Sequence, residues 1–333
     1  MPQISIIIPV YNVAQYLRKC LDSVIAQTFV NWECVCIDDG STDGSGDILD
    51  EYAINDDRFK VMHKKNAGYS SAMNCGIDRI RGEWFGIVEP DDWIERDMYE
   101  CLLSSVSEDV DVVKGNFVSF HADTQEVRHE TWRSKDRFGL MSQHPSVWTC
   151  LYRTKFIRDK KIFFLHVPGA AWTDNLFMYQ TLVLARGVKY VDRIVYHYLV
   201  KSWEYIDCCS NFRIPLDRIR EIIEWASTLD GVDCRVWQSL QRRTLSYIST
   251  AYAKARRSEL IDYRRRVRRI AKVIPRDINL ERELQRVLSA PILYFAYSRY
   301  VRSGKWNSWA RKLYRYLRKS GEFSGQKGNR SIH

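Results

Sequence analysis

The chain has 333 residues, 45% of them apolar and 28% charged, and this composition excludes a largely disordered protein. Its net charge of +10 predicts an acidic partner, which would be nucleic acid, anionic lipid or a phosphorylated substrate. The apolar stretches are too short to cross a membrane, the first residues do not resemble a signal peptide, and the nine cysteines include no C-x-x-C pair. We therefore expect a cytoplasmic protein with reduced thiols.

Strands and helices are predicted to alternate along the first 90 residues. Short apolar runs predict strands at residues 5–9, 33–37, 59–63 and 84–88. Apolar residues at helical spacing predict helices at residues 13–25, 48–52 and 70–80, with Asn12 at the N-cap of the first. This alternation predicts an α/β fold with a doubly wound, mostly parallel sheet and helices on both faces.

An acidic stretch follows the fourth strand. Pro90 cannot donate a hydrogen bond to a sheet, so the strand should end there and place Asp91 and Asp92 just beyond its carboxyl end. Ligands of open α/β sheets bind at that edge, and a divalent cation shared with substrate phosphates would offset the repulsion between adjacent carboxylates. The alternative is a solvated acidic turn that opens the next helix. Because the chain has neither a G-x-G-x-x-G nor a P-loop pattern, phosphate binding would depend on a metal, which favours the functional interpretation.

Four short motifs stand near strand ends in this part of the chain. They are Ser5-x-x-x-Pro9-x-Tyr11-Asn12, Asp38-Asp39-Gly40-Ser41-Thr42-Asp43, Asn66-x-Gly68-x-Ser70-x-Ala72-x-Asn74-x-Gly76 and Glu89-Pro90-Asp91-Asp92. In this order and spacing they resemble the motifs of the family-2 glycosyltransferases of bacterial polysaccharide type, which have the GT-A fold. The resemblance is close over about residues 1–120 and looser to about residue 200.

The resemblance implies a role for each motif. It places Pro9, Tyr11 and Asp39 in the nucleotide base pocket, Asp91 near the ribose or diphosphate, and Asp92 on a Mg or Mn ion. The other residues that it assigns to nucleotide-sugar binding are Asn12, Asn66, Gly68, Ser70 and Asn74. Two positions depart from the family pattern, since Met73 stands where Arg is common and Glu89 replaces the first Asp of the D-x-D motif.

The resemblance predicts a GT-A domain over residues 1–200, with a nucleotide-sugar half at 1–120 and an acceptor half at 121–200. A strand is predicted at residues 110–118 and a hairpin or mobile loop at residues 120–137. Trp148, Trp172 and the Tyr-His-Tyr run at residues 196–198 could stack on sugar rings or belong to the core. His197 could approach the diphosphate or the metal, or it could be a structural residue.

Asp174 is the candidate catalytic base. Thr173 suits an N-cap position and apolar residues continue at helical spacing, so Asp174 should lie in the first turn of a helix. The alternative is an Asp that only complements the helix dipole. The resemblance favours the base, because the E-D motif of the family falls at this position, with Thr173 in place of the Glu. The helix N-terminus would lower the pKa of Asp174, whereas desolvation by Trp172 and Phe177 would raise it.

The composition changes after about residue 201. Amphipathic helices are predicted at residues 216–226 and 236–254, and an arginine cluster follows at residues 264–269. A later helix carries residues suited to a membrane surface, namely Trp306, Trp309, Arg311, Arg315 and Arg318. We expect a basic helical region at residues 201–320 and a disordered tail at residues 321–333. The basic helices would either lie on an anionic membrane or pack on the catalytic domain with their charges in water.

These features predict a metal-dependent, inverting glycosyltransferase of the hexosyltransferase type. It would move a sugar from a nucleotide diphosphate donor, which we expect to be UDP-linked, to a carbohydrate or lipid-linked acceptor in surface polysaccharide synthesis. The Mn or Mg ion would neutralise charge on the departing diphosphate while a carboxylate takes the proton of the acceptor. The alternatives are a metal-dependent nucleotidyltransferase and a non-catalytic nucleic-acid-binding module. We expect no nucleic-acid partner, because the chain has no recognised nucleic-acid motif and its basic residues lie away from the acidic stretch.

Overall fold

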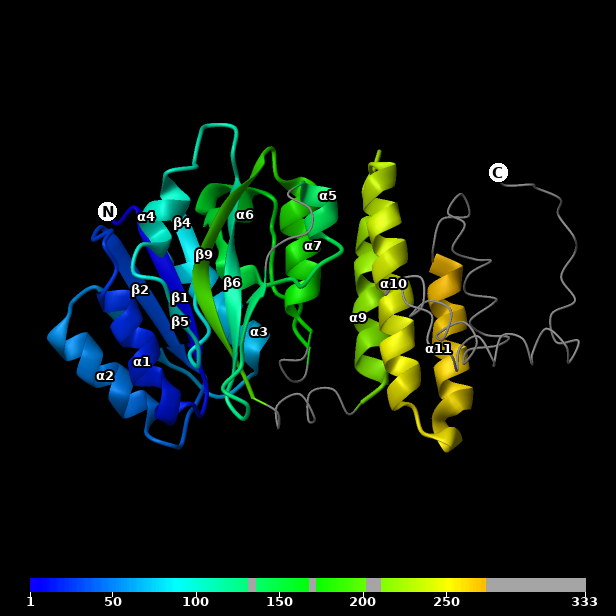
Figure 1. Ribbon diagram of the computed structural model, residues 1–333, viewed down its shortest axis with the longest axis horizontal. Coiled ribbons are helices and arrows are strands. Elements are labelled where there is room, and N and C mark those ends of the chain that lie inside the picture. The colour runs from blue at the N-terminus through cyan, green and yellow to red at the C-terminus, as the bar shows by residue number, and fades with distance from the viewer. Residues whose placement is uncertain (131–135, 168–171, 202–210, 274–333) are drawn as a thin grey trace, which may run out of the picture. The chain divides into compact units, whose positions relative to one another are not determined.

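The computed structural model describes residues 1–130, 136–167, 172–201 and 211–273 (Figure 1). Within it, Met1–Lys254 forms one compact unit and the chain from Ala255 belongs to a second. The first unit therefore continues past residue 200, where the sequence placed a domain boundary. The predicted helix around Trp306 and the predicted tail at residues 321–333 lie outside the described residues.

A four-stranded parallel layer forms the N-terminal half of the sheet. Its strands are β1 (Ile4–Val10), β2 (Trp32–Asp38), β3 (Phe59–His63) and β4 (Trp84–Ile87), in the order β3-β2-β1-β4. All seven residues of β1 are buried, as expected for a continuous apolar run in the centre of a parallel sheet. The four strands lie where the sequence predicted them.

Three helices connect these strands and cover both faces of the layer. They are α1 (Ala14–Ile25), α2 (Ser45–Asn55) and α3 (Tyr69–Arg79). The chain moves outward from β1 to β3 and then returns to the other side of β1, so right-handed crossovers place α3 on the face opposite to α1 and α2. Figure 1 shows α1 and α2 together on one side of β1 and β2, with α3 on the other. This reversal between β1 and β4 creates the crevice in which ligands of such sheets bind.

The C-terminal half of the sheet is mixed. Its strands are β5 (Trp93–Ile94), β6 (Val112–His121), β7 (Val127–Glu130), β8 (Cys150–Arg153) and β9 (Val188–Val200). From β4 the order continues β8-β6-β9-β5, with β8 antiparallel to both of its neighbours and β9 parallel to β6. The predicted hairpin is confirmed, because β7 pairs with the end of β6. The α/β fold class is confirmed, and the N-terminal layer is the part of the sheet in which all pairs are parallel.

Further helices pack around this half. In the first unit they are α4 (Met98–Leu103), α5 (Arg137–Leu140), η1 (Val147–Thr149), α6 (Thr154–Asp159), α7 (Asp174–Leu184), α9 (Arg213–Ala226) and α10 (Cys234–Lys254). The apolar face predicted for α9 is buried, and α9 packs against both α7 and α10. The second unit contains η2 (Arg257–Glu259) and α11 (Leu260–Val273). Over the described residues, no helix combines the length and the apolar character that a membrane span needs.

Candidate active site

The loops after β1 and β2 are tied together at the carboxyl edge of the sheet. Pro9 is buried in β1, whereas the side chain of Tyr11 is 50% exposed just beyond the strand. The sequence predicted Asn12 as the N-cap of α1, but Val13 occupies that position. Instead Asn12 has a φ of 51° and its Oδ1 accepts a hydrogen bond of 2.8 Å from the backbone N–H of Thr42. The residue therefore links the two loops instead of starting the helix.

The cap of α1 comes from the second of these loops. Ser45 Oγ accepts a hydrogen bond of 3.0 Å from the N–H of Val13, and Asp43 Oδ2 accepts one of 2.9 Å from the N–H of Ala14. Helix N-termini leave such N–H groups without intrahelical partners, so distant side chains can satisfy them. The Asp-rich motif thus fixes the start of α1 next to Tyr11 and Asn12.

Asp39 shapes the loop that follows β3. It is 2% exposed, and its carboxylate accepts hydrogen bonds from the N–H of Ala67 at 3.0 Å and of Gly68 at 2.7 Å. Its Oδ1 also pairs with the Lys64 ammonium. Gly68 has a φ of 89°, a conformation that favours glycine, and it is the N-cap of α3. Asp39 therefore holds Gly68 at the crevice, and the exposed Asn66 lies in the same loop.

The remaining residues of the third motif face the protein interior. Ser70 is buried, and its Oγ has no hydrogen-bond partner in the described part of the chain. Asn74 donates to the carbonyl oxygen of Phe164 and accepts from its N–H, both at 2.8 Å. Met73 is fully buried, so the position where the family commonly has Arg offers no charge to a diphosphate. In this structure Asn74 holds the backbone of a second segment.

The acids after β4 have three different environments. Glu89 is half-buried and its Oε1 accepts a hydrogen bond of 2.6 Å from the Tyr69 hydroxyl. Asp91 has a side chain that is 19% exposed, and it pairs with the buried Lys201 ammonium at 2.6 Å. Asp92 is 1% exposed, and its two oxygens accept hydrogen bonds from the Tyr196 hydroxyl at 2.9 Å and the N–H of Leu199 at 2.7 Å.

These environments bear on the metal assignment. Burial and the charge of Asp91 raise the pKa of Asp92 well above its usual range, and both of its oxygens already accept hydrogen bonds. Asp92 is thus held by the protein at both oxygens, and Asp91 is the acid of this pair that reaches solvent. In the residues that the structure describes, no group of three or more His, Cys, Asp or Glu side chains could hold a metal. A single carboxylate still fits a Mg or Mn ion that is carried mainly by substrate phosphates.

Asp174 of α7 lies near the acids that follow β4, and we call Glu89, Asp91 and Asp174 the acid cluster. It is the first residue of α7 and is half-buried, and Thr173 at the N-cap makes no side-chain capping hydrogen bond. Burial raises the pKa of Asp174 to about 6, although the Arg243 charge and hydrogen bonds at the helix start oppose this rise. Burial also raises the pKa of Glu89 to about 8, and the charges of Asp91 and Asp174 add to the shift. Three carboxyl groups from two distant parts of the chain therefore interact at the crevice.

The aromatic candidates are mainly structural. Trp148 and Tyr196 are buried and stack with ring centroids 4.2 Å apart. His197 Nε2 donates a hydrogen bond of 2.7 Å to Oε1 of Glu95, and the His197 ring stacks on Trp93 with the ring centroids 5.1 Å apart. Burial favours the core interpretation of Trp148 and Tyr196, and the contacts of His197 favour a structural role. Trp172 differs, because it lies two residues before Asp174 and its ring packs edge-on against Tyr247.

Three contacts of the site were not predicted. Lys201 neutralises Asp91, the Tyr69 hydroxyl binds Glu89, and Tyr196 binds Asp92. Lys201 could have been suspected, because it directly follows Leu199 and Val200 in a chain that has acids at the ends of other strands. No sequence signal identifies the two tyrosines as partners of these acids, because the contacts depend on strand order.

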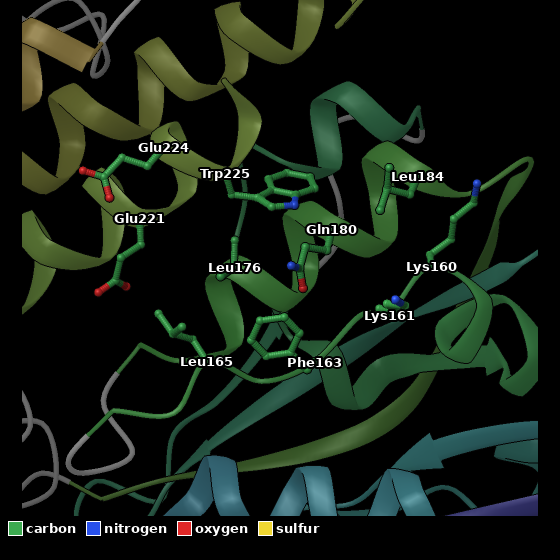
Figure 2. A pocket seen from close by; sticks show the side chains of 10 residues that line it. All are labelled: Lys160, Lys161, Phe163, Leu165, Leu176, Gln180, Leu184, Glu221, Glu224 and Trp225. Carbon is green, nitrogen blue, oxygen red and sulfur yellow. The ribbon is translucent and has the colours of Figure 1, made fainter. Parts of the chain in front are cut away.

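A groove of about 360 Å³ lies between α7, α9 and the segment around residues 160–165 (Figure 2). Leu176, Gln180 and Leu184 line it from α7, and Trp225 lines it from α9. Phe163 adds an aromatic side chain that is 45% exposed. The groove includes none of the predicted site residues.

Comparison with solved structures defines the class of fold. S. aureus TarS (residues 1–349) matches with a TM-score of 0.73 and 20% identity, and the match covers 91% of this chain and 92% of that one. TarS has also been solved in complex with UDP and with UDP-GlcNAc. The likeness shows the fold, and the expected GT-A class is confirmed.

Sequence comparison then gives the family. Residues 5–167 match the model described as Glycosyl transferase family 2. EpsH of Bacillus subtilis is 33% identical over 60% of this chain and 61% of its own length. Glycosyltransferase GlyA of Streptococcus pneumoniae is 32% identical over 60% of this chain and 31% of its own length. The chain thus spans less than two thirds of these relatives, and its residues 5–167 belong to glycosyl transferase family 2.

Proposed function

We propose that the chain is an inverting, metal-dependent glycosyltransferase that moves a sugar from a UDP-linked donor to a carbohydrate or lipid-linked acceptor in surface polysaccharide synthesis. The observation that carries this proposal is the interaction of Glu89, Asp91 and Asp174 at the carboxyl edge of the sheet. The TarS complexes with UDP and UDP-GlcNAc support a UDP-linked donor. The nucleotide would lie over the loops that carry Tyr11 and Asp39.

Asp174 is the proposed base. Its carboxylate accepts the proton of an acceptor hydroxyl, whose oxygen forms a bond to the anomeric carbon of the donor. The bond from that carbon to the diphosphate oxygen breaks, and its electron pair leaves with UDP, so no covalent intermediate is needed. A pKa of about 6 keeps Asp174 ionised at neutral pH and close to the optimum for a general base.

Asp91 is the proposed protein ligand of a Mn or Mg ion. The donor phosphates would supply further ligands, which is the usual arrangement for Mg in proteins. When bound, such an ion neutralises negative charge on a departing diphosphate. The Lys201 ammonium holds Oδ2 of Asp91, so Oδ1 is the oxygen that would bind the ion.

A donor screen with an Asp174→Asn variant tests the proposal. UDP-linked sugars with Mn should raise the melting temperature, since a ligand at 100 times its Kd stabilises by about 2.7 kcal/mol. The variant should bind UDP as the wild type does but release UDP from the donor at least about 10²-fold more slowly, the usual effect of losing a base. Wild-type turnover should rise with pH through about 6, as Asp174 ionises.

The stability of the same variant provides a control. A folded-state pKa above the unfolded value means that Asp174 favours folding when it is protonated, and this contribution is lost as pH rises through about 6. The Asn variant should therefore melt at a higher temperature than the wild type at pH 8. Turnover within a few-fold of the wild type would place the base elsewhere. Pyrophosphate release from nucleoside triphosphates would favour the nucleotidyltransferase, and salt-sensitive RNA retention without donor turnover would favour the binding module.

We further propose that the protein acts at the cytoplasmic face of a membrane, with α11 against anionic lipid. Arg264, Arg265, Arg268 and Arg269 are exposed on this helix, whereas Tyr263 and Val267 are buried. The helix therefore presents a basic face, which anionic headgroups would attract.

A further inference from the structure

Arg243 of α10 is a buried cation that connects three segments of the chain. It is 7% exposed, and its Nε and Nη2 donate to the carbonyl oxygen of Met141 at 3.1 and 2.8 Å. Nη2 also donates to the carbonyl oxygen of Gln143. Its Nη1 donates at 2.8 Å to Oδ1 of Asn175, the residue that follows Asp174 in α7. The guanidinium thus joins α10 to the residues after α5 and to the start of α7.

These contacts fix the orientation of the Asn175 amide. Its Oδ1 accepts hydrogen bonds from Arg243 and from the Tyr247 hydroxyl, so the oxygen end of the amide faces α10. The NH₂ end must then face the other way, where Nδ2 donates to Oδ1 of Asp174 at 3.0 Å and to the carbonyl oxygen of Trp172 at 3.3 Å. Because the amide cannot turn over without losing these bonds, its NH₂ group stays directed at Asp174 and helps to hold that carboxylate in place.

The charge of Arg243 also acts on Asp174. In the described chain, Arg243 has no carboxylate within ion-pair distance, and burying a charge without compensation is costly. The Arg243 charge lowers the pKa of the Asp174 carboxyl against the effect of burial. Among the described residues, Asp174 also interacts with the titratable groups of Glu89, Tyr69, Lys114, Tyr152 and Tyr247. Lys114 is the cation of this set, and it donates hydrogen bonds to the segment at residues 145–150.

We propose that Arg243 is a positioning residue for the reaction, which acts through Asn175 to hold and ionise Asp174. The inference rests on the proposed role of Asp174 as the base. It assigns a function in the active site to a helix that lies beyond residues 5–167, the part matched by the family model. The guanidinium itself need not touch either substrate.

Four variants test the proposal in the full-length protein. Arg243→Met removes both charge and hydrogen bonds, Arg243→Lys keeps the charge, and Tyr247→Phe removes one donor to Asn175. Arg242→Met is the matched control, because Arg242 is the exposed neighbour on the same helix. Release of UDP from the nucleotide sugar selected by the donor screen is followed against pH, with UDP affinity and melting temperature measured in parallel.

These measurements should distinguish the effect of the Arg243 charge from the effect of its hydrogen bonds. Arg243→Met should lower kcat about 10-fold or more and move the acid limb of the pH profile to higher pH, because Asp174 loses the cation that favours its ionised form. Arg243→Lys should keep the position of the acid limb but lower kcat, and Tyr247→Phe should lower kcat several-fold. UDP affinity should stay at the wild-type value throughout, and Arg242→Met should behave as the wild type.

Several outcomes would overturn the proposal. A folded Arg243→Met variant with wild-type kcat and an unmoved acid limb would do so. If that variant does not fold, wild-type kcat in both Arg243→Lys and Tyr247→Phe would overturn the proposal instead. Asp174→Asn is measured alongside them: if it stays active, the proposed base has failed, whereas an inactive Asp174→Asn with fully active Arg243 variants removes Arg243 alone.

Discussion

Two neighbouring carboxylates, Asp91 and Asp92, differ in what surrounds them. The Asp92 side chain is enclosed by Tyr196 and Leu199, whereas that of Asp91 faces a lysine and solvent. A buried group with both oxygens hydrogen-bonded contributes to the fold, because removing it leaves a donor without a partner. The accessible group has its Oδ1 for an ion, because the Lys201 ammonium holds Oδ2. At the scale of single residues, the two acids therefore have separate tasks.

Paired Asn substitutions should separate these tasks. Asp92→Asn should lower the free energy of unfolding by about 1–3 kcal/mol, since an amide cannot accept both hydrogen bonds, while UDP binding keeps its dependence on Mn. Asp91→Asn should also lower stability, because the buried Lys201 ammonium loses this carboxylate, but it alone should remove the dependence on Mn, because a neutral amide is a poor ligand for a hard cation. Denaturant unfolding and UDP titrations with and without Mn measure both effects. Loss of Mn dependence in Asp92→Asn alone would restore the original assignment to Asp92.

At the scale of elements, one side chain joins helix α3 to the segment before α7. The Asn74 amide forms a pair of hydrogen bonds with the backbone of Phe164, whose ring stacks on Phe177 of α7 at 4.2 Å. Phe164 also contacts Tyr69, the residue that binds Glu89. Asn74 can therefore affect Glu89 and Asp174 through Phe164 and its ring contacts.

Asn74→Ala should destabilise the protein without weakening nucleotide binding directly. The substitution leaves the N–H and C=O of Phe164 without their partners, at a cost of about 1–3 kcal/mol. Thermal unfolding should show this loss, and UDP affinity measured well below the melting temperature should match the wild type. Asn74→Asp is a useful comparison, since it can accept from the N–H but cannot donate to the carbonyl. A large drop in UDP affinity with unchanged stability would instead support the role predicted from the family motif.

Part of the fold and part of the candidate site could be predicted from the sequence. Strands such as β1 and helices such as α9 were predictable, because burial on both faces or on one stripe leaves a direct pattern in the chain. The motifs also indicated which loops meet at the crevice. The partners of the acids were not predictable, since Lys201 and Tyr196 approach them only through the placement of β9 beside β6 and β5. Asn12 was misassigned for a similar reason, because the cap of α1 comes from a different loop.

At the scale of the whole molecule, the charge of +10 is not spread evenly. The crevice gathers acids, whereas α11 in the second unit exposes four arginines on one face. Such a distribution suits an enzyme that binds a metal and a nucleotide sugar at one place and an anionic surface at another.

Vesicle binding tests this division. The full-length protein should co-sediment with vesicles that contain phosphatidylglycerol at low salt, and it should dissociate as salt screens the charges. Replacing Arg264, Arg265, Arg268 and Arg269 by Gln should weaken binding, since each basic residue near such a surface contributes about 1 kcal/mol. Arg242→Gln serves as the control on α10. Failure of the wild type to bind at low salt would mean that the arginines are only solvated charges.

The position of β9 also sets the order in which the site can be completed during synthesis. The hydrogen bonds that Asp92 accepts from Tyr196 and Leu199 join residues 104 and 107 positions apart, whereas those that Asp39 accepts from Ala67 and Gly68 join residues 28 and 29 positions apart. Closing a longer loop costs more chain entropy, and the later partner must first leave the ribosome. The nucleotide loops can therefore form on the nascent chain while Asp92 still lacks both of its partners. The acid cluster is the last part of the crevice to be assembled, so a ribosome-bound chain that ends before β9 carries an incomplete active site.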